Sequence, residues 1–194
     1  MPTVYVIEDG PDERVALESM FRSAGLRVQC FESAESFLDT FDPDSADSAG
    51  CVVVDVQLPG KSGMELLHEL RLRSRIPVIV VTGYAEVADS VQAMRIGAID
   101  FIEKPYRAEH LLDQVHRGLK HHEAIRIIER RLSSLTARER EVMEMLATGK
   151  TAVQVADELG LSRKTVDVHR SRILSKAAVS NVVELVSLLH QLDS

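Results

Sequence analysis

The sequence predicts an α/β doubly wound domain with a five-stranded parallel sheet, followed by a helical linker and an all-α domain of four helices. Three observations lead to this prediction. Short β-rich runs alternate with helical segments in the first part, only helical patterns follow in the second, and the net charge changes sign between them. With 194 residues, 45% of them hydrophobic, the chain is long enough for two packed cores.

The predicted sheet consists of five short runs of β-forming residues: Thr3–Ile7, Leu26–Phe31, Cys51–Asp55, Val78–Thr82 and Asp100–Glu103. Helical segments separate them. One has apolar residues at i, i+3, i+4 and i+7 and ends at Gly25, and a later one carries Val87, Val91 and Met94 on one face and ends near Gly97. Right-handed βα connections then give a doubly wound sheet, whose ligand site lies at the carboxyl ends of the strands.

Polar side chains stand where four of these strands end. They are Glu8, Asp9, Asp55, Thr82 and Lys104. Three carboxylates brought together repel one another unless a cation is present, and an all-oxygen set suits Mg²⁺. A hydroxyl and an ammonium suit phosphate oxygens, so the pattern predicts phosphoryl transfer onto Asp55, with Thr82 and Lys104 holding the transferred group. Taken singly, each residue is more often a turn, sheet or solvated side chain, and it is the joint placement that favours a site.

The motifs that carry these residues resemble those of two-component response regulator receivers, which have a flavodoxin-like fold. The motifs are VIEDG, VVVDVQLPGKSG, VIVVTGYA and GAIDFIEKP, and they fall within roughly the first 120 residues, about one domain. The resemblance implies that Asp55 is the phosphoacceptor and that Thr82 and Phe101 form a switch pair. It also implies a cis Lys104–Pro105 bond.

The same resemblance implies a metal-binding set around Asp55. Asp9 binds Mg²⁺ directly, Glu8 mostly through water, and Gln57 through its backbone carbonyl. Two positions depart from the commoner family pattern: Glu8 replaces an aspartate, and Gly10 replaces a third acidic or polar residue. These departures bear on Mg²⁺ affinity rather than on the chemistry. Phe101 is the weakest assignment, because an aromatic residue in a short strand is more often simply part of the core.

The second part of the chain has a different charge balance. Up to Gly118 there are 11 Lys and Arg against 20 Asp and Glu, a net of −9, whereas from Leu119 onward there are 12 against 10, a net of +2. The segment 163–176 carries five basic residues against one acid, Asp167. A basic helix of this kind indicates nucleic-acid binding more strongly than total charge does.

A helical connector over 120–133 is predicted to join the two parts. Its apolar stripe slips in phase at His121–His122, so a long coiled coil is not favoured. The two histidines have no partners at metal-ligand spacing, and a solvated helix face is the favoured interpretation. Likewise, Cys30 and Cys51 lack metal or disulfide spacing and are interpreted as buried small hydrophobes.

The predicted four-helix domain contains a helix-turn-helix. Thr136 to Glu139 form a capping box, a second helix spans Ala152–Leu159, Gly160 turns the chain, and Ser162 caps the third helix. In that third helix the inward residues are predicted to be Val166, Ile173 and Ala177. Its outer side offers basic, hydroxyl and apolar contacts for DNA from Lys164, Thr165, Val168, Arg170, Ser171 and Arg172.

From LTAREREV to VHRSRI this segment resembles LuxR-type DNA-binding domains. Ala152–Val153 and Asp167 depart from the pattern, and Asp167 would affect base preference or affinity.

The last helix, Asn181 to Leu192, is apolar on more than one face. This predicts a partner surface, with a homodimer on DNA as the simplest case and a contact with the first domain as the alternative.

Together the two resemblances identify a response regulator of the FixJ/NarL class. The expected domains are a receiver at 1–119, a helical linker at 120–133 and a LuxR-type domain at 134–194. The expected partners are a sensor histidine kinase, double-stranded DNA and a second copy, and the expected catalysis is limited to the receiver's own phosphorylation and dephosphorylation. No signal peptide or membrane segment is expected, so the cytoplasm is the default location.

Two other functions share features of this sequence. A haloacid dehalogenase-type phosphatase also uses a strand-end aspartate, but it requires a second acid two residues on, where this chain has Gln57. A phosphorylation-independent DNA-binding protein with a vestigial receiver is disfavoured by the full acidic set and Lys104.

Overall fold

The computed structural model describes residues 2–43, 49–84 and 86–193. The chain divides into two compact units, Met1–Glu123 and Ala124–Ser194, and each is described by itself. Ala85, the last residue of the motif VIVVTGYA, lies outside the described residues.

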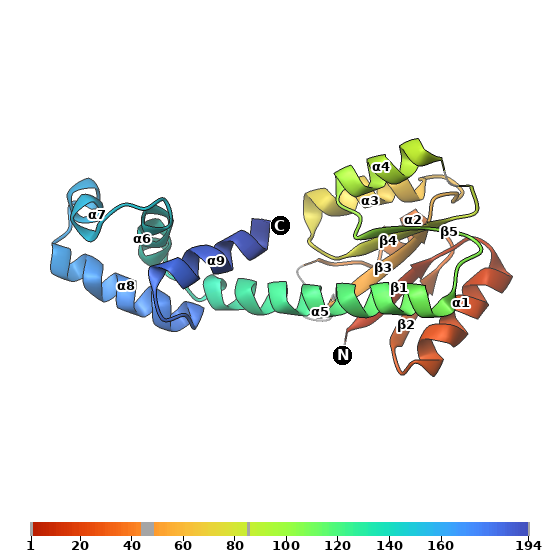
Figure 1. Ribbon diagram of the computed structural model, residues 1–194, viewed down its shortest axis with the longest axis horizontal. Coiled ribbons are helices and arrows are strands. Elements are labelled where there is room, and N and C mark those ends of the chain that lie inside the picture. Colours follow the sequence, from red (N-terminus) through yellow and green to blue (C-terminus); the bar gives the residue numbers. More distant parts are fainter. Residues whose placement is uncertain (1, 44–48, 85, 194) are drawn as a thin grey trace. The chain divides into compact units, whose positions relative to one another are not determined.

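The first unit is built on a five-stranded parallel sheet, as predicted (Figure 1). Its strands are β1 (Thr3–Ile7), β2 (Arg27–Phe31), β3 (Gly50–Asp55), β4 (Val78–Thr82) and β5 (Asp100–Glu103), arranged in the order β2-β1-β3-β4-β5. The register pairs Ile7 with Val54, Asp55 with Val81, and Thr82 with Glu103. The carboxyl ends of β1, β3, β4 and β5 therefore meet at one edge of the sheet.

Helices cover both faces of this sheet. They are α1 (Pro11–Ser23), α2 (Ala34–Leu38), α3 (Gly63–Arg73), α4 (Val87–Ile96) and α5 (Ala108–Ser133). One core contains Leu17 and Phe21 of α1 with Leu111 and Val115 of α5, and the other contains residues of α2, α3 and α4, such as Phe37. The residues of β1, β3 and β4 are buried on both sides of the sheet, which explains why these strands are continuous apolar runs in the sequence.

The apolar stripe predicted for the helix before Gly97 is present, but it is exposed. Val87, Val91 and Met94 are 82%, 45% and 50% exposed, and the one buried residue of α4 is Ala93. Gly97 ends α4 in the left-handed conformation, with φ of 115°. Helix α4 thus packs on the core through Ala93 and the partly buried Ile96, while Val87, Val91 and Met94 stay exposed.

The second unit contains α6 (Ala137–Ala147), α7 (Ala152–Leu159), α8 (Arg163–Ala177) and α9 (Val182–Asp193). Capping boxes open α6 at Thr136 and α7 at Thr151, and Ser162 caps α8. Gly160, with φ of 64°, makes the tight turn between α7 and α8. The shared core includes residues of all four helices together with Ile128 and Leu132 from the end of α5. The predicted helix-turn-helix is confirmed.

Helix α5 is continuous from Ala108 to Ser133, and it corrects one prediction. His121 is exposed as expected, but His122 is only 7% exposed, and its Nδ1 atom lies 2.9 Å from the Gly50 carbonyl oxygen. The interpretation of His122 as part of a solvated face was therefore wrong, because this side of α5 packs against the beginning of β3. A contact between residues 72 positions apart leaves no local signal in the sequence.

Both cysteines are free, as expected from their spacing. Cys51 is buried, and burial raises the pKa of its thiol, whereas Cys30 is only half-buried.

Among the described residues, no single helix is long and apolar enough to cross a membrane. The bent pair α8 and α9 passes the same test of length and composition, although Val166, Ile173 and Leu185 of this pair belong to the core of the second unit.

Candidate functional site

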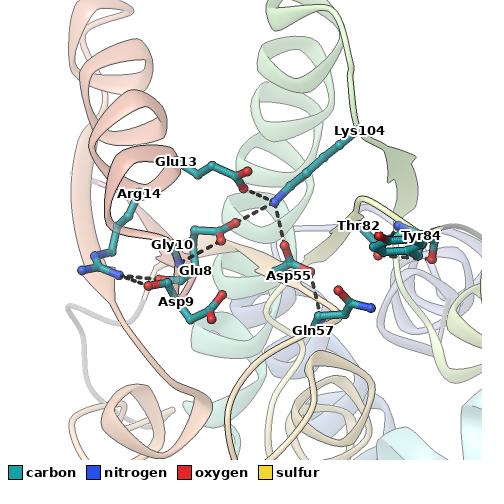
Figure 2. Close-up of polar contacts among 10 residues, drawn as sticks. All are labelled: Glu8, Asp9, Gly10, Glu13, Arg14, Asp55, Gln57, Thr82, Tyr84 and Lys104. Atoms are coloured by element: carbon teal, nitrogen blue, oxygen red, sulfur yellow. Dashed lines mark hydrogen bonds and ion pairs between the residues drawn. The ribbon is translucent and has the colours of Figure 1, made fainter.

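Three of the predicted site residues converge at the carboxyl edge of the sheet. Glu8 follows β1, Asp55 ends β3 and Lys104 follows β5, and their side chains meet as Figure 2 shows. The Lys104 Nζ atom donates to Asp55 Oδ2 at 2.6 Å and to Glu8 Oε2 at 2.9 Å. The backbone N–H of Lys104 donates to the Thr82 carbonyl at 2.7 Å, and this bond extends the pairing of β5 with β4 beyond the last strand residue. The Lys104–Pro105 bond is cis, as expected.

A fourth member of this cluster, Glu13, was missed by the sequence analysis. It lies in the first turn of α1, and its carboxylate accepts a hydrogen bond from the same Lys104 ammonium. One oxygen from each of Glu8, Glu13 and Asp55 can be chosen so that all three lie within 4.8 Å of one another. A helix that starts at Pro11 directly after the strand end places its first turn at this edge, but the contact of Glu13 with Lys104, 91 positions away, leaves no local signal in the sequence.

Asp55 is fixed from two directions. Its Oδ1 atom accepts from the backbone N–H of Gln57 at 2.8 Å, and its Oδ2 atom accepts from Lys104. The residue is only 8% exposed. A buried carboxylate with both oxygens held has a defined direction, as a nucleophile at a strand end requires.

Charge in this cluster is unbalanced, with three carboxylates around one ammonium. Burial raises the pKa of Glu8, while the hydrogen bond and charge of Lys104 act to lower it. Burial by itself would lower the pKa of Lys104, but the hydrogen bonds to Asp55, Glu13 and Glu8 raise it above its usual range. The hydrogen bond from Lys104 lowers the pKa of Glu13. The acids thus hold Lys104 in its charged form, and a net negative charge remains.

Asp9 and Gln57 occupy the same edge but stand outside the hydrogen bonds of Lys104. Asp9 is exposed, and in Figure 2 its carboxylate points toward Asp55 and Gln57. Arg14 donates to the backbone carbonyls of Glu8 at 2.7 Å and of Asp9 at 3.1 Å, which fixes the turn that carries both acids. The ligand roles of Asp9, Glu8 and the Gln57 carbonyl stay predictions.

Thr82 and Phe101 do not take part in the acidic cluster. The Thr82 hydroxyl is buried and bonds to the following loop, donating to the Tyr84 carbonyl at 3.3 Å and accepting from the Tyr84 N–H at 3.2 Å. Phe101 is half-buried against the core on the face of α2, α3 and α4, and Tyr84 is 76% exposed. Their role as a switch pair stays a prediction.

The residues of the cluster fit a hard divalent cation. Carboxylate oxygens are the ligands that Mg²⁺ prefers, and one or two carboxylates are enough for a protein Mg²⁺ site. The excess negative charge around Lys104 is the electrostatic condition that favours such an ion.

A second candidate site is the outer face of α8. Val166, Ile173 and Ala177 are buried as predicted, and the exposed residues include Lys164, Val168, Arg170, Ser171 and Arg172. Thr165 is half-buried and bonds to Ser162 at the start of the helix. Val168 is 43% exposed, so it is free of the core, and Asp167 lies 3.9 Å from Arg163. This face combines positive charge, hydroxyls and an apolar contact, which suits a major groove.

Two family models match the chain. Residues 4–116 match the response regulator receiver domain, and residues 133–189 match the bacterial regulatory proteins of the luxR family. Nodulation protein W of Bradyrhizobium diazoefficiens is 39% identical over 193 residues, covering 95% of this chain and 84% of the relative. Transcriptional regulatory protein FixJ of the same organism is 35% identical and covers 95% and 93%, respectively.

Solved structures are similar over the same length. The response regulator StyR is 36% identical with a TM-score of 0.60, covering 98% of both chains. Full-length FixJ from B. japonicum is 34% identical with a TM-score of 0.58, covering 99% of this chain and 97% of that one.

Proposed function

The chain belongs to the two-component response regulators of the FixJ/NarL class, and from this premise we propose that it accepts a phosphoryl group on Asp55 from a sensor histidine kinase. In this proposal the phosphorylated receiver forms a homodimer, and the LuxR-type domain binds double-stranded DNA to regulate transcription in the cytoplasm. The proposed domains are the receiver at 1–119, the linker at 120–133 and the DNA-binding domain at 134–194.

One observation carries the proposal: the Asp55 carboxylate is held at a strand end by Lys104 and by the Gln57 amide. An Asp55 oxygen attacks the phosphorus of a phosphohistidine, an O–P bond forms, and the P–N bond breaks. The electron pair stays on the imidazole nitrogen, which takes up a proton. Lys104 stabilises the negative oxygens of the transferred group, and the Thr82 hydroxyl leaves its bonds to Tyr84 to bind one of them.

The acidic residues around Asp55 are proposed to hold Mg²⁺. The ligands would come from Asp55, Asp9 and the Gln57 carbonyl, with Glu8 acting through water. When bound, Mg²⁺ supplies positive charge that neutralises the carboxylates and the transferred phosphoryl group. The chain's own residues orient the nucleophile and hold the product, so the catalysis is limited to the receiver's own phosphorylation and dephosphorylation.

Phosphorylation then biases the receiver between two states. Movement of Thr82 toward the phosphoryl group changes the loop after β4, and Phe101 in β5 changes its packing with it.

In the DNA-bound state, Lys164, Arg170 and Arg172 contact phosphates or guanine, Thr165 and Ser171 donate or accept hydrogen bonds, and Val168 contacts a thymine methyl group.

The test is labelling with a small phosphodonor. Acetyl phosphate plus Mg²⁺ should phosphorylate the chain, and reduction of the acyl phosphate followed by peptide mass spectrometry should place the label on Asp55. Asp55→Asn should abolish labelling, whereas Asp113→Asn, the same change at an exposed site on α5, should leave it intact. Full labelling of Asp55→Asn would place the acceptor elsewhere, and absence of labelling in the unchanged chain would favour a vestigial receiver.

A further inference from the structure

The Lys104 ammonium has no N–H left for another acceptor in the described structure. An ammonium carries three N–H donors, and the three acceptors here are Glu8, Asp55 and Glu13. Figure 2 shows their carboxylates converging on the Lys104 nitrogen from separate elements. A phosphoryl oxygen that binds Lys104 must therefore share or displace one of these bonds.

The three acids differ in how easily they can be displaced. The side chains of Glu8 and Asp55 are 5% and 9% exposed, whereas that of Glu13 is 57% exposed. Glu8 and Asp55 stand at strand ends, and Glu13 reaches the ammonium from the first turn of α1. Released from Lys104, the Glu13 carboxylate can be hydrated at once, whereas Glu8 would stay buried without a charged partner, with only the Gly10 N–H, at 3.2 Å, still donating to it.

We propose that Glu13 is a positioning residue that acts through Lys104 as an electrostatic brake on the phosphorylation of Asp55. This inference rests on the proposed function. Glu13 shares the positive charge of Lys104 that would otherwise stabilise the phosphoryl group, and its own charge repels the anionic phosphodonor. It holds the ammonium in place in the unphosphorylated state and slows the arrival of the phosphoryl group.

The experiment measures the rate of Asp55 phosphorylation by acetyl phosphate in the full chain at saturating Mg²⁺. Glu13→Gln removes the charge but keeps an oxygen that can accept from Lys104, and it should raise kcat/KM about three- to tenfold, mainly through a lower KM. Glu13→Asp keeps the charge and should stay within about twofold of the unchanged chain. Asp12→Asn removes the same charge from an exposed neighbouring residue and should also change the rate less than about twofold.

Salt distinguishes this mechanism from a structural effect. Repulsion between charges is screened, so the gain from Glu13→Gln should shrink between low salt and about 0.5 M salt. A gain independent of salt, an equal gain from Asp12→Asn, or an unchanged rate in Glu13→Gln would overturn the proposal.

The second readout is the concentration of Mg²⁺ that gives half-maximal phosphorylation. Binding of Mg²⁺ in the absence of phosphodonor is also measured, by the thermal shift of the protein. The brake predicts a change of less than about threefold in Glu13→Gln. A tenfold or larger increase together with a slower rate would make Glu13 a metal ligand and overturn the brake. All of these comparisons require that the unchanged chain is labelled on Asp55. If the proposed function is wrong, the unchanged chain itself is not labelled, and this result is distinct from a failure of the inference about Glu13.

Discussion

Lys104 and Lys176 both form ion pairs with buried acids, but the net charge of the two clusters differs. In the first unit, one Lys104 ammonium lies among three carboxylates. In the second unit, Lys176 donates to Glu139 at 2.7 Å and to the Ser134 carbonyl at 3.0 Å. The first cluster has a net negative charge, and the second is neutral.

The pKa values follow this difference. Burial raises the pKa of Glu8, so its ionised form is disfavoured in the fold. The hydrogen bond from Lys176, followed by the N–H and hydroxyl of Thr136, lowers the pKa of Glu139 to about 2. Glu139 thus joins the start of α6 to the end of α8 and stabilises the unit, whereas the buried Glu8 beside Lys104 weakens its unit and is suited to an incoming cation.

The largest effect on stability is expected at the Glu139–Lys176 ion pair. Glu139→Gln removes a charged acceptor from both Lys176 and the α6 cap, and it should lower the stability of the second unit by about 2–3 kcal/mol. Amide hydrogen exchange within 137–147 and 163–177 of the full chain measures this. Glu141→Gln, which removes only the exposed pair with Arg138, should cost less than about 1 kcal/mol.

The same pair predicts an acid response of the second unit. A carboxylate with a lowered folded pKa stabilises the fold above its ordinary value of 4.5, and this stability is lost as the pH falls from 4.5 toward about 2. Exchange protection of α6 and α8 should therefore fall over this range in the unchanged chain. The Glu139→Gln variant should show a smaller fall, and an identical pH profile would contradict the assignment.

A smaller effect of opposite sign is expected at Glu8. An acid with a raised folded pKa stabilises the fold fully below its ordinary value of 4.5, and that stability is lost as the pH rises through the folded pKa. At pH 7 without divalent metal, Glu8→Gln should therefore stabilise the first unit. Thermal unfolding checks the sign, with Glu32→Gln at an exposed position as the control.

Added Mg²⁺ should reverse the stabilising effect of Glu8→Gln. Added Mg²⁺ should stabilise the unchanged chain more than Glu8→Gln, because the variant offers one negative charge fewer. A Glu8→Gln variant that is less stable without metal would show that the cluster is a structural ion-pair network, like the one around Glu139.

The smallest effects are expected on the outer face of α8, where DNA is the proposed partner of the basic residues. Arg172→Ala should weaken binding to all DNA sequences and lower the log–log salt slope by about one. Val168→Ser should leave this slope unchanged and alter the preference at one base pair by about 1 kcal/mol. Binding to a site and its single-base variants across a salt series separates the two, and a changed salt slope in Val168→Ser would contradict the assignment.

The fold and three of the four members of the polar cluster could be predicted because they depend on short-range patterns. Continuous apolar runs indicate strands buried on both faces, and parallel strands bring their ends together, which places Glu8, Asp55 and Lys104 at one edge. The buried face of α8 likewise followed from helical spacing and was confirmed at Val166 and Ile173.

The missed features depend on contacts between distant segments. Glu13 meets Lys104 across 91 positions, and His122 meets Gly50 across 72. A helical pattern gives the relative phase of its residues but not which side faces the core, and Ala93 rather than Val91 packs inward in α4. The apolar surface of α9 is partly covered within its own unit, where Leu185 is buried in the core, whereas Val183 is 76% exposed.

We expect phosphorylation of Asp55 in the first unit to control DNA binding by the second. The most direct measurement is the affinity of the full chain for a DNA site selected in vitro, with and without acetyl phosphate and Mg²⁺, in the unchanged chain and in Asp55→Asn. On this expectation, the phosphodonor should tighten binding about 5- to 150-fold in the unchanged chain and have no effect in Asp55→Asn. Equal affinities in all four conditions, with Asp55 shown to be phosphorylated, would contradict it.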